Sequence, residues 1–427
     1  MRICIIGAGF TGLAASLRLA KLGHNVSVFE KEQQPGGLAI GFKDKGWKWP
    51  LEKHYHHLFT SDKHIKNLAK EVNHKILFTR PKTSTFVNGN TYQLDSPTSL
   101  LAFPHLSLIE KIRAGITLAY LKFTPLWKPL EKITAANFLK QTMGQSTWKI
   151  LWEPLFKAKF GKHKESIPAS WFWARVKKRS TSLGYPEGGF QQLAENIQHT
   201  TEKYGAQFIF GNGGTSIKRT NNSFVVTTNQ GGRHLADRVI CTLPTPLFCK
   251  ITKGLPRTYI KKVSNLSSLG ALNLVLILKK PFLADGTYWL NINDQGFPFL
   301  AIVEHTNFMD KRHYNENHII YVGNYLPTNH PYMRMTKEEL FKVYAPYLRK
   351  INRNFELFTL NFELFKAPFA QPIIPLNYSK IIPPLKTPIP NLYLANIQQV
   401  YPWDRGTNYA VELGNTVAKL AIDETDY

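Results

Sequence analysis

The sequence is poor in cysteine and in acidic residues, and it has no long apolar run. Its three cysteines, Cys4, Cys241 and Cys249, are too few for a disulfide framework and lack the spacing of a metal site. No uncharged run reaches the roughly 20 residues that a membrane-spanning helix needs. Because "MRICIIGAGF" leads directly into an apolar strand and a glycine turn, we expect no secretory signal. These absences favour a cytoplasmic protein without a bound metal.

The shortage of acidic residues leaves a large positive charge. Lys and Arg number 54 against 29 Asp and Glu, which gives a formal net charge of +25. Such a field favours an anionic membrane surface, nucleic acid or phosphorylated substrates, or it serves solubility through self-repulsion. No zinc finger or RNA-binding motif accompanies the charge, so we expect no nucleic-acid partner. The oligomeric state stays open.

The first thirty residues have the pattern of a strand, a helix and a second strand. An apolar run over 2–6 precedes "GAGFTG", an amphipathic helix is expected over 13–22, and 26–30 is again strand-like. Gly7, Gly9 and Gly12 form the G-x-G-x-x-G motif, in which the glycines allow a tight turn, a close approach of pyrophosphate and close packing of helix on strand. Glu30 ends the second strand, where an acid accepts hydrogen bonds from a ribose. The pattern predicts a dinucleotide site.

Three further segments make a resemblance definite. Gly36 and Gly37 follow Glu30 in "EKEQQPGGLA", "GYPEGGFQQLAENI" lies in mid-chain, and "NLYLANIQQVYPWDRGTNYAVELGNTVAKLA" lies near the C-terminus. With these motifs the chain resembles the superfamily of flavin-containing amine oxidases, protoporphyrinogen oxidases and phytoene desaturases. In that superfamily an acid followed by a Gly-Gly pair marks FAD rather than NAD. The resemblance therefore implies FAD as the cofactor.

The resemblance also implies which residues contact FAD. The glycine turn, the acid, the Gly-Gly pair, one residue of the second half and the start of the last helix would hold it. These residues are Gly7, Gly9, Phe10, Thr11, Gly12, Glu30, Lys31, Gly36, Gly37, Leu38, Ile217, Asn396, Arg405, Thr407 and Asn408. Backbone N–H groups at the start of the last helix would stabilise negative charge on a reduced flavin.

The layout predicts an α/β protein with a discontinuous FAD-binding domain. Its Rossmann-like parallel sheet with helices would use residues 1–80, 186–252 and 386–427. Residues 81–185, which look mostly helical, and 253–385, which alternate like antiparallel strands, would form an inserted α+β substrate domain with an antiparallel sheet and helices.

Two polar segments are candidates for the substrate side. In "LEKHYHHLF", Tyr55, His56 and His57 follow soon after the FAD motif and are interpreted as an active-site wall, with structural hydrogen bonding or a metal site as alternatives. In "VEHTNF", the residues Glu304, His305 and Asn307 lie at an expected strand end and suggest a cavity or a solvated loop. His56 or Glu304 is the candidate catalytic base.

Aromatic residues are dense between positions 148 and 173. They include four tryptophans, and the interpretation is a helical core or, alternatively, an apolar tunnel or membrane-facing groove. Lysines from Lys157 to Lys164 lie beside them and suggest peripheral contact with an anionic membrane.

The sequence thus predicts an FAD-dependent oxidoreductase that transfers a hydride from an amine or a lipophilic C–H substrate to flavin. Two alternatives remain. One is a non-redox flavoenzyme such as a sugar-nucleotide mutase, which predicts an arginine pair facing the flavin. The other is an FAD-containing binding protein that acts at an anionic surface.

Overall fold

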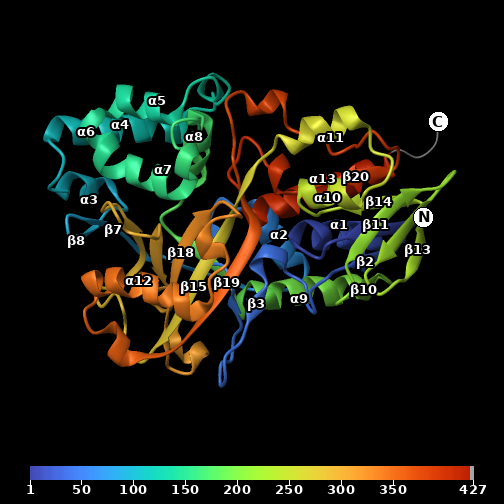
Figure 1. The fold of residues 1–427 in the computed structure, drawn as a ribbon, viewed down its shortest axis with the longest axis horizontal. Coiled ribbons are helices and arrows are strands. Elements are labelled where there is room, and N and C mark those ends of the chain that lie inside the picture. Colours follow the sequence, from blue (N-terminus) through green and yellow to red (C-terminus); the bar gives the residue numbers. More distant parts are fainter. Residues whose placement is uncertain (424–427) are drawn as a thin grey trace.

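A five-stranded parallel sheet forms one end of the molecule, at the right of Figure 1, in the computed structural model, which describes residues 1–423. The strand order is β10-β2-β1-β14-β20, with every neighbouring pair parallel. The strands are β10 (Gln207–Ile209), β2 (Asn25–Phe29), β1 (Arg2–Ile6), β14 (Arg238–Cys241) and β20 (Leu392–Leu394). The interior residues of these strands are mostly apolar and buried because both faces of the sheet are covered.

Helices pack on the parallel sheet and bring distant segments together. Helix α1 (Phe10–Lys21) contacts both α9 (Gly189–Glu202) and α13 (Thr407–Ile422). A Cβ added at Gly414 of α13 would lie 2.3 Å from the carbonyl oxygen of Thr11, so α1 and α13 touch backbone to backbone. A three-stranded antiparallel sheet lies beside the parallel one: β11 (Gly214–Arg219), β12 (Phe224–Thr228) and β13 (Arg233–Ala236).

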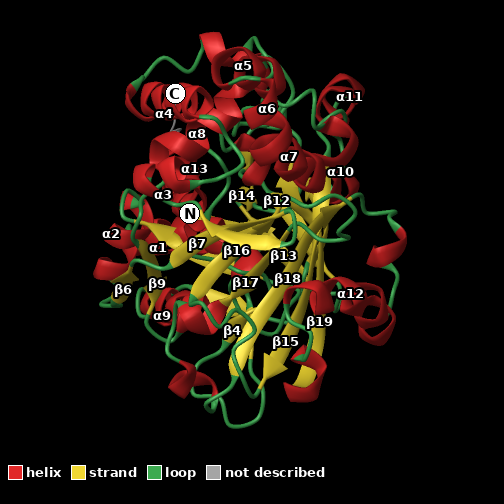
Figure 2. Cartoon of the chain, turned by 90° about the vertical axis from the view of Figure 1, so that its left-hand side faces the viewer, coloured by secondary structure: helices red, strands yellow, loops and turns green. Residues whose placement is uncertain are grey.

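A seven-stranded sheet forms the second region, and its long strands run through the lower half of Figure 2. Its order is β19-β15-β18-β17-β16-β7-β8, antiparallel except for the pair β16 and β7. The strands are β19 (Thr359–Pro372), β15 (Ser268–Leu278), β18 (His318–Leu326), β17 (Ala301–Glu304), β16 (Thr287–Ile292), β7 (Lys82–Val87) and β8 (Asn90–Gln93). Helix α12 (Lys337–Ile351) packs against β15 and β19.

A helical lobe completes the molecule and occupies the upper left of Figure 1. It comprises α3 (Pro97–Ala102), α4 (Leu108–Phe123), α5 (Ala135–Met143), α6 (Gln145–Thr147), α7 (Glu153–Phe160) and α8 (Ala169–Lys178). The smaller elements are β3 (Gly41–Phe42), β4 (Leu51–Glu52), β5 (Leu58–Phe59), α2 (Lys63–Glu71), β6 (Ile76–Thr79), β9 (Leu183–Pro186), α10 (Thr245–Ile251) and α11 (Arg257–Ser264). Across residues 1–423, no helix has the length and apolarity that a membrane crossing requires.

The segment 81–185 is less helical than its sequence suggested. Residues 82–93 form the β7–β8 hairpin and add two strands to the seven-stranded sheet. Asn88 and Gly89 make the two-residue turn with φ of 51° and 75°, the conformation that an Asn-Gly hairpin favours. The division into an FAD-binding and a substrate domain stays a prediction, although each large sheet draws its strands from one of the two expected sets of segments.

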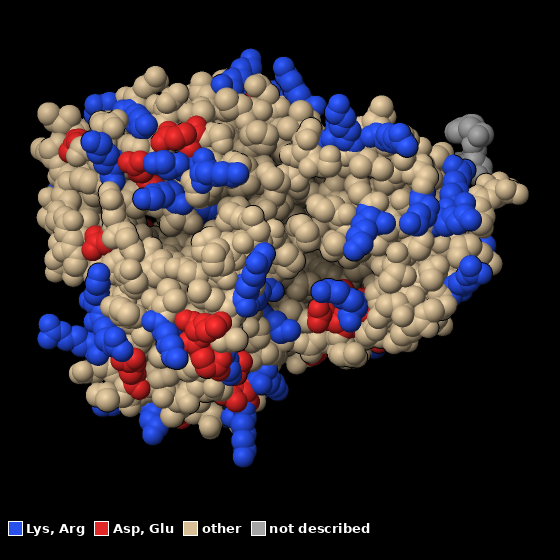
Figure 3. Space-filling model, viewed as in Figure 1, with Lys and Arg blue, Asp and Glu red and all other residues tan. Residues whose placement is uncertain are grey.

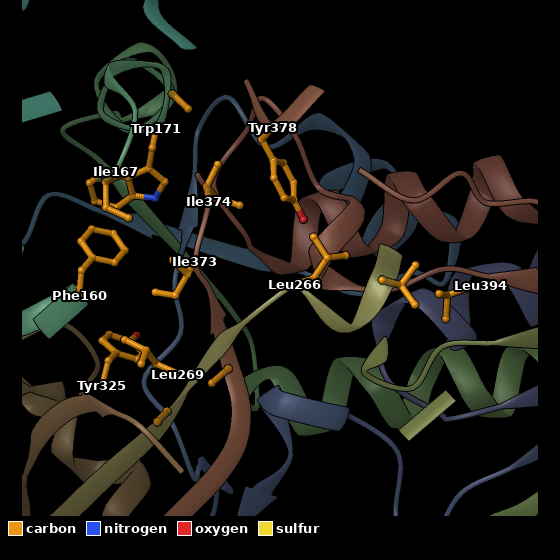
Figure 4. Packing of buried hydrophobic residues seen from close by; sticks show 14 of the residues in the cluster. Phe160, Ile167, Trp171, Leu266, Leu269, Tyr325, Ile373, Ile374, Tyr378 and Leu394 are labelled. Carbon is orange, nitrogen blue, oxygen red and sulfur yellow. The ribbon is translucent and has the colours of Figure 1, made fainter. Parts of the chain in front are cut away.

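Most aromatic residues between positions 148 and 173 of the helical lobe are core. Trp148, Trp171 and Trp173 are each at most 2% exposed, and Phe156 and Phe160 pack among them. Figure 4 shows part of this cluster, with Phe160 of α7, Trp171 of α8 and Tyr325 of β18 on the same side. This burial supports the interpretation of a helical core over the alternative of a membrane-facing groove.

Candidate functional site

The three glycines of the first turn have different structural roles. Gly7 has φ of +105°, and a Cβ there would lie 2.3 Å from Thr242 Oγ1; a Cβ at Gly12 would lie 2.0 Å from the Gly7 carbonyl oxygen. At Gly7 and Gly12 the surrounding protein therefore leaves no room for a side chain. Gly9 has an ordinary extended backbone, with φ −71° and ψ 173°, and a Cβ there would meet only Gly37 Cα, at 3.6 Å. The protein therefore has room for a side chain at Gly9, and its own packing does not require glycine there.

The Gly-Gly pair faces this turn. Gly36 donates its N–H to the Ala8 carbonyl oxygen at 2.9 Å and forms a parallel bridge with Gly9. Gly36 and Gly37 have φ of +133° and +59°, values that favour glycine. Within residues 1–423, no side chain caps the N-terminus of α1. The result is a backbone surface without side chains beside free helical N–H groups, which suits a diphosphate.

Glu30 lies beside this surface and is 8% exposed. Its carboxylate accepts hydrogen bonds from the N–H of Ala8 at 2.7 Å and of Glu32 at 3.0 Å. Each carboxylate oxygen keeps a further lone pair, so the fixed carboxylate can also accept a ribose hydroxyl. Lys31, in contrast, extends outward to pair with Glu32 at 3.1 Å.

The remaining residues expected at FAD in the first half differ in position. Phe10 packs in the core against Phe190, with Thr11 next to it on α1. Ile217 is 1% exposed in β11, where it offers only backbone groups. Leu38 follows the Gly-Gly pair and lines the pocket described below.

Helix α13 presents a second open N-terminus. Gly406 precedes it, and no side chain within residues 1–423 caps it, so the N–H groups from Thr407 onward are available to an anion. Asn408 serves another purpose: its Oδ1 accepts the N–H groups of His64 and Ile65 at 2.8 and 3.3 Å, which ties α13 to the start of α2.

Asn396 is also used within the protein. Its Nδ2 donates to the carbonyl oxygen of Leu243 at 3.0 Å and to Thr245 Oγ1 at 3.1 Å, while its Oδ1 accepts the N–H of Gln398 at 3.0 Å. The FAD contacts at Asn396 and Asn408 stay a prediction, and the backbone N–H of Asn408 fits the role expected at the start of α13. Both amides hold backbone segments in place and leave any FAD contact to main-chain groups.

A small pocket lies where the segment after the Gly36–Gly37 pair and the segment before α13 meet the seven-stranded sheet. Leu38, one residue after Gly37, and Arg405, one residue before Gly406, both line it. The other lining residues come from the 54–56 segment, β15, β18 and β19: His54, Tyr55, His56, Ala271, Asn273, Asn324, Tyr325 and Ala370. The expected wall residues Tyr55 and His56 are thus brought together with Arg405.

Hydrogen bonds fix the orientation of the two pocket histidines. The Nδ1 atom of His56 lies 2.6 Å from the carbonyl oxygen of His54, and a carbonyl only accepts, so Nδ1 carries the hydrogen. The Nε2 atom of His56 is then a free acceptor. The Nδ1 atom of His54 accepts from Asn273 Nδ2 at 2.6 Å. Within residues 1–423, Asn273 Oδ1 has no hydrogen-bond partner, although Asn273 is 2% exposed.

Burial keeps these imidazoles neutral. It lowers the pKa of His56 to about 4 and, together with the charges of His56 and Arg405, the pKa of His54 to about 3. At neutral pH each ring therefore has one donor and one acceptor nitrogen. The pocket has a neutral base in His56 rather than a cation.

Arg405 is held in the pocket wall by two side chains. Its Nε donates to Gln371 Oε1 at 2.8 Å, and its Nη2 donates to the Tyr325 hydroxyl. That hydroxyl also lies 3.5 Å from the hydroxyl of Tyr55. The expected role of Arg405 near the flavin fits this placement, because its charge borders both the pocket and the start of α13.

The other expected substrate residues do not reach this pocket. Glu304 is fully buried, and its carboxylate accepts the N–H groups of Phe282 and Leu283 at 3.1 and 2.5 Å. Asn307 donates to the carbonyl oxygens of Leu283 and Thr287. Glu304 is therefore not placed to act as a base on a substrate in this pocket.

Two histidines share that structural role. His305 is 3% exposed and bonds through Nε2 to the Tyr314 hydroxyl at 2.7 Å. His57 points to the opposite side from His56 and lies 3.2 Å from the Tyr288 hydroxyl. Among residues 1–423, no group of three or more His, Cys, Asp or Glu residues gathers to hold a metal.

Sequence reasoning missed the pocket residues supplied by the long strands. Asn273 and Asn324 interrupt the apolar runs "ALNLVLIL" and "HIIYVGNYL", and both are at most 7% exposed. A polar residue inside a buried strand is unusual and could have indicated a cavity. Tyr325 and Ala370 carry no such signal, because only the pairing of β18 and β19 with β15 brings them there.

The parallel sheet, the two uncapped helices and the glycine surface define a dinucleotide-binding flavoprotein fold. The family model described as flavin containing amine oxidoreductase matches residues 10–419. The chain therefore belongs to this family of FAD-dependent oxidoreductases, which confirms the predicted family, fold class and cofactor. The residues present fit FAD, since the side-chain-free surface of Gly9 and Gly37 would hold its diphosphate.

Three known proteins illustrate the similarity. The 1-hydroxycarotenoid 3,4-desaturase of Flavobacterium sp. (strain P99-3) is 22% identical over 304 residues, and the match spans 62% of each chain. An oxidoreductase structure from Methanosarcina mazei has a TM-score of 0.76 at 19% identity, covering 98% of this chain and 100% of that one. Wild-type putrescine oxidase bound to putrescine has a TM-score of 0.77 at 16% identity, covering 99% and 100%. These structural similarities concern the fold.

Proposed function

We propose that this chain oxidises a lipophilic small molecule at a C–H bond in the pocket bounded by Leu38 and Arg405. The observation that carries the proposal is that the pocket adjoins both the Gly36–Gly37 pair, expected at the diphosphate of FAD, and the start of α13, expected at its flavin ring. Bound FAD supplies the hydride acceptor. The chain's own part is to orient the substrate, exclude water and take up a proton.

The side chains favour desaturation over amine oxidation. Arg405 places a positive charge in the wall, which disfavours a protonated amine, whereas the neutral Nε2 of His56 can accept a proton from a carbon. When a C=C bond forms, one carbon loses a hydride and its neighbour loses a proton, so a base is needed. The carotenoid substrate named for the 22% identical relative supports this class. The single arginine among the lining residues gives no support to the mutase alternative.

Mixing FAD-loaded protein with isoprenoid polyenes without oxygen is expected to bleach the flavin absorbance near its visible maximum, whereas mono- and diamines leave it unchanged. His56→Gln should keep its FAD and bleach at least about 100-fold more slowly, because it lacks the proton acceptor. His57→Gln is the matched control, since His57 lies outside the pocket, and its rate should stay within about threefold. Bleaching by amines alone, or an unchanged His56→Gln rate, would contradict the proposal.

We further infer peripheral contact with an anionic membrane through the outer face of α4. Large apolar side chains recur along this helix with helical spacing and are 49–79% exposed: Leu108, Ile109, Ile112, Ile116, Tyr120 and Phe123. The opposite face of α4, with Ala114, Thr117 and Leu121, packs on the lobe. A helix that is apolar on its solvent side is typical of membrane contact.

Positive charge surrounds this face. Lys111, Arg113, Lys122 and Lys128 lie on α4 or just after it, and Glu110, next to them, is engaged in the capping box of α4 with Ser107. Figure 3 shows blue Lys and Arg side chains outnumbering red acidic ones over the helical lobe. Charge complementarity therefore selects an anionic lipid surface as the partner. Of the lysines expected at this contact, Lys157 and Lys162 are exposed and Lys159 is buried, so α4 offers the larger exposed apolar face.

Replacing Ile112, Ile116 and Phe123 together by serine is expected to weaken binding to vesicles of anionic phospholipid at least tenfold, because their apolar area no longer enters the bilayer. Co-sedimentation with anionic and with zwitterionic vesicles measures the effect. Leu357→Ser is the control: Leu357 is 85% exposed but far from α4, so binding should not change. Equal binding of the triple variant and the original protein would exclude α4 as the contact face.

A further inference from the structure

A buried lysine without an ionic partner lies next to the pocket. Lys159 of α7 is 6% exposed, yet it makes no hydrogen bond or ion pair within residues 1–423. Its ammonium lies among three rings, at 5.1 Å from the centroid of Tyr325, 5.3 Å from Trp171 and 5.9 Å from Phe160. In Figure 4 these three rings form one column at the edge of the packed cluster. Cation–π contacts orient the ammonium but satisfy none of its three donors.

Two arginines share the same rings. The guanidinium of Arg405 lies 5.0 Å from the centroid of Tyr325, and that of Arg175 lies 5.1 Å from the centroid of Trp171. Three cations from three different elements thus surround two aromatic side chains. One of them, Arg405, also lines the pocket, as does Tyr325 itself.

Only one carboxylate balances these charges. Asp404 pairs with Arg175 Nη1 at 2.7 Å and accepts the indole N–H of Trp171 at 3.1 Å. The oxygen that accepts from Trp171, Oδ1, also accepts the backbone N–H of Arg405 at 3.1 Å. Burial would raise the pKa of Asp404, but the charges of Lys159, Arg175 and Arg405 outweigh it and lower the pKa. Asp404 is ionised, and its one carboxylate is shared by the three basic side chains Lys159, Arg175 and Arg405.

A basic side chain in such a largely buried position is disfavoured in its charged form unless an anion pairs with it. Burial and the charge of Arg175 lower the pKa of Lys159 well below its usual range. A structural lysine would be expected to have a carboxylate or carbonyl acceptor, and none is present among the described residues. An arriving anion would supply the missing acceptor and pair with Arg405 on its other side.

We propose that Lys159, with Arg405 and Tyr325, forms a subsite for an oxyanion, a carboxylate or phosphate group carried by the substrate. The proposal rests on the proposed function only in taking this pocket as the substrate site. It adds that the substrate is amphiphilic, with a lipophilic body at the flavin and an anionic group at Lys159. The aromatic rings around Lys159 would then exclude water from the ion pair and so strengthen it.

Equilibrium binding of a matched pair of probes tests this subsite. Isothermal titration calorimetry of the FAD-loaded protein with dodecanoate and with dodecanol is expected to show at least tenfold tighter binding of the carboxylate. Inorganic pyrophosphate forms the third arm: binding of pyrophosphate with no preference for dodecanoate over dodecanol would mean a site for a free anion and would overturn the proposal. These calorimetric titrations do not need hydride transfer, so their result can be interpreted even if no substrate bleaches the flavin.

Variants separate a ligand-binding role from a structural one. Lys159→Gln should abolish the preference for dodecanoate while FAD content stays the same, whereas Lys159→Arg should keep it within about threefold. Lys157→Gln, an exposed change of equal charge on the same helix, should have no effect. Because removing an unpaired buried charge relieves its desolvation, Lys159→Gln should also raise the melting temperature. A lowered melting temperature, or an equal affinity of the original protein for both probes, would overturn the proposal.

Discussion

Valine in place of Gly9 is expected to yield a folded protein that no longer retains FAD. The backbone of Gly9 is extended, and a Cβ there stands 3.6 Å from Gly37 Cα, an ordinary contact, so the protein tolerates a side chain. The same side chain would fill the surface on which the diphosphate must approach the N–H groups of α1. We expect FAD affinity to fall at least 100-fold, or about 2.8 kcal/mol, with little change in the melting temperature of the apoprotein.

The measurement is FAD reconstitution of the apoprotein, followed by flavin fluorescence, next to thermal unfolding. Gly115→Val is the control, because a Cβ at Gly115 meets nothing within 4 Å and lies in α4, away from the turn. Gly12→Val gives the contrasting behaviour: its Cβ would lie 2.0 Å from the Gly7 carbonyl oxygen, so it should unfold the protein. A Gly9→Val protein that purifies with full FAD would disprove the assignment of the phosphate turn.

Acidification from pH 6.5 to pH 5.5 is expected to destabilise the protein, by about 2 kcal/mol in the free energy of unfolding. Burial lowers the pKa values of four histidines from the ordinary 6.5 to between about 3 and 4: His54, His56, His57 and His305. Between pH 6.5 and pH 5.5 these histidines therefore bind protons in the unfolded chain but not in the folded chain. The stabilisation is complete above pH 6.5 and is lost as the pH falls towards 4.

Two carboxyl groups change the stability in the opposite direction, and their effect is included in the expected loss of about 2 kcal/mol. Burial raises the pKa of Glu52 to about 7 and that of Asp62 to about 6, so their contributions are complete at low pH and lost as the pH rises. Four histidines outweigh two acids. Urea unfolding followed by tryptophan fluorescence, at fixed ionic strength and flavin content, checks the sign.

One variant isolates a single histidine. His305→Gln removes a group that is 3% exposed and can keep a hydrogen bond to Tyr314. It should reduce the loss of stability between pH 6.5 and pH 5.5 by about 1 kcal/mol. His199→Gln, on α9, is the control, since the side chain of His199 is exposed. A protein that is equally stable at both pH values would show that these imidazoles are protonated in the folded state.

Local patterns were sufficient to predict the parallel-sheet half of the fold. The strand over 2–6, the helix after the glycine turn and the strand over 26–30 follow from short apolar runs and glycine positions, and all are present, the last as Asn25–Phe29. The hairpin at 82–93 was overlooked although Asn88-Gly89 signals its turn. Its strands are short and partly polar, so they are stable only as an extension of the seven-stranded sheet.

The site was predicted unevenly for a related reason. His56 and Tyr55 follow closely after the FAD motif, and the structure places both in the pocket. The polar cluster at 304–307 has the same composition but holds the backbone of 282–287 instead, since buried N–H and carbonyl groups there need partners. A buried polar residue in the sequence indicates that a hydrogen bond is needed, but it does not indicate whether the partner is a ligand or the chain itself.

The sequence by itself determined the glycine turn, its acid and the family, because these depend on backbone conformation over a few adjacent residues. Only the tertiary structure decided that Lys159, Arg175 and Arg405, separated by up to 246 residues, share two aromatic rings with a single carboxylate between them. It also decided that α4 turns an apolar face outward while the tryptophans are buried. The charge balance around a residue and its exposure both depend on which residues lie near it in the folded protein. The packing of the sheets and the helical lobe decides which residues these are.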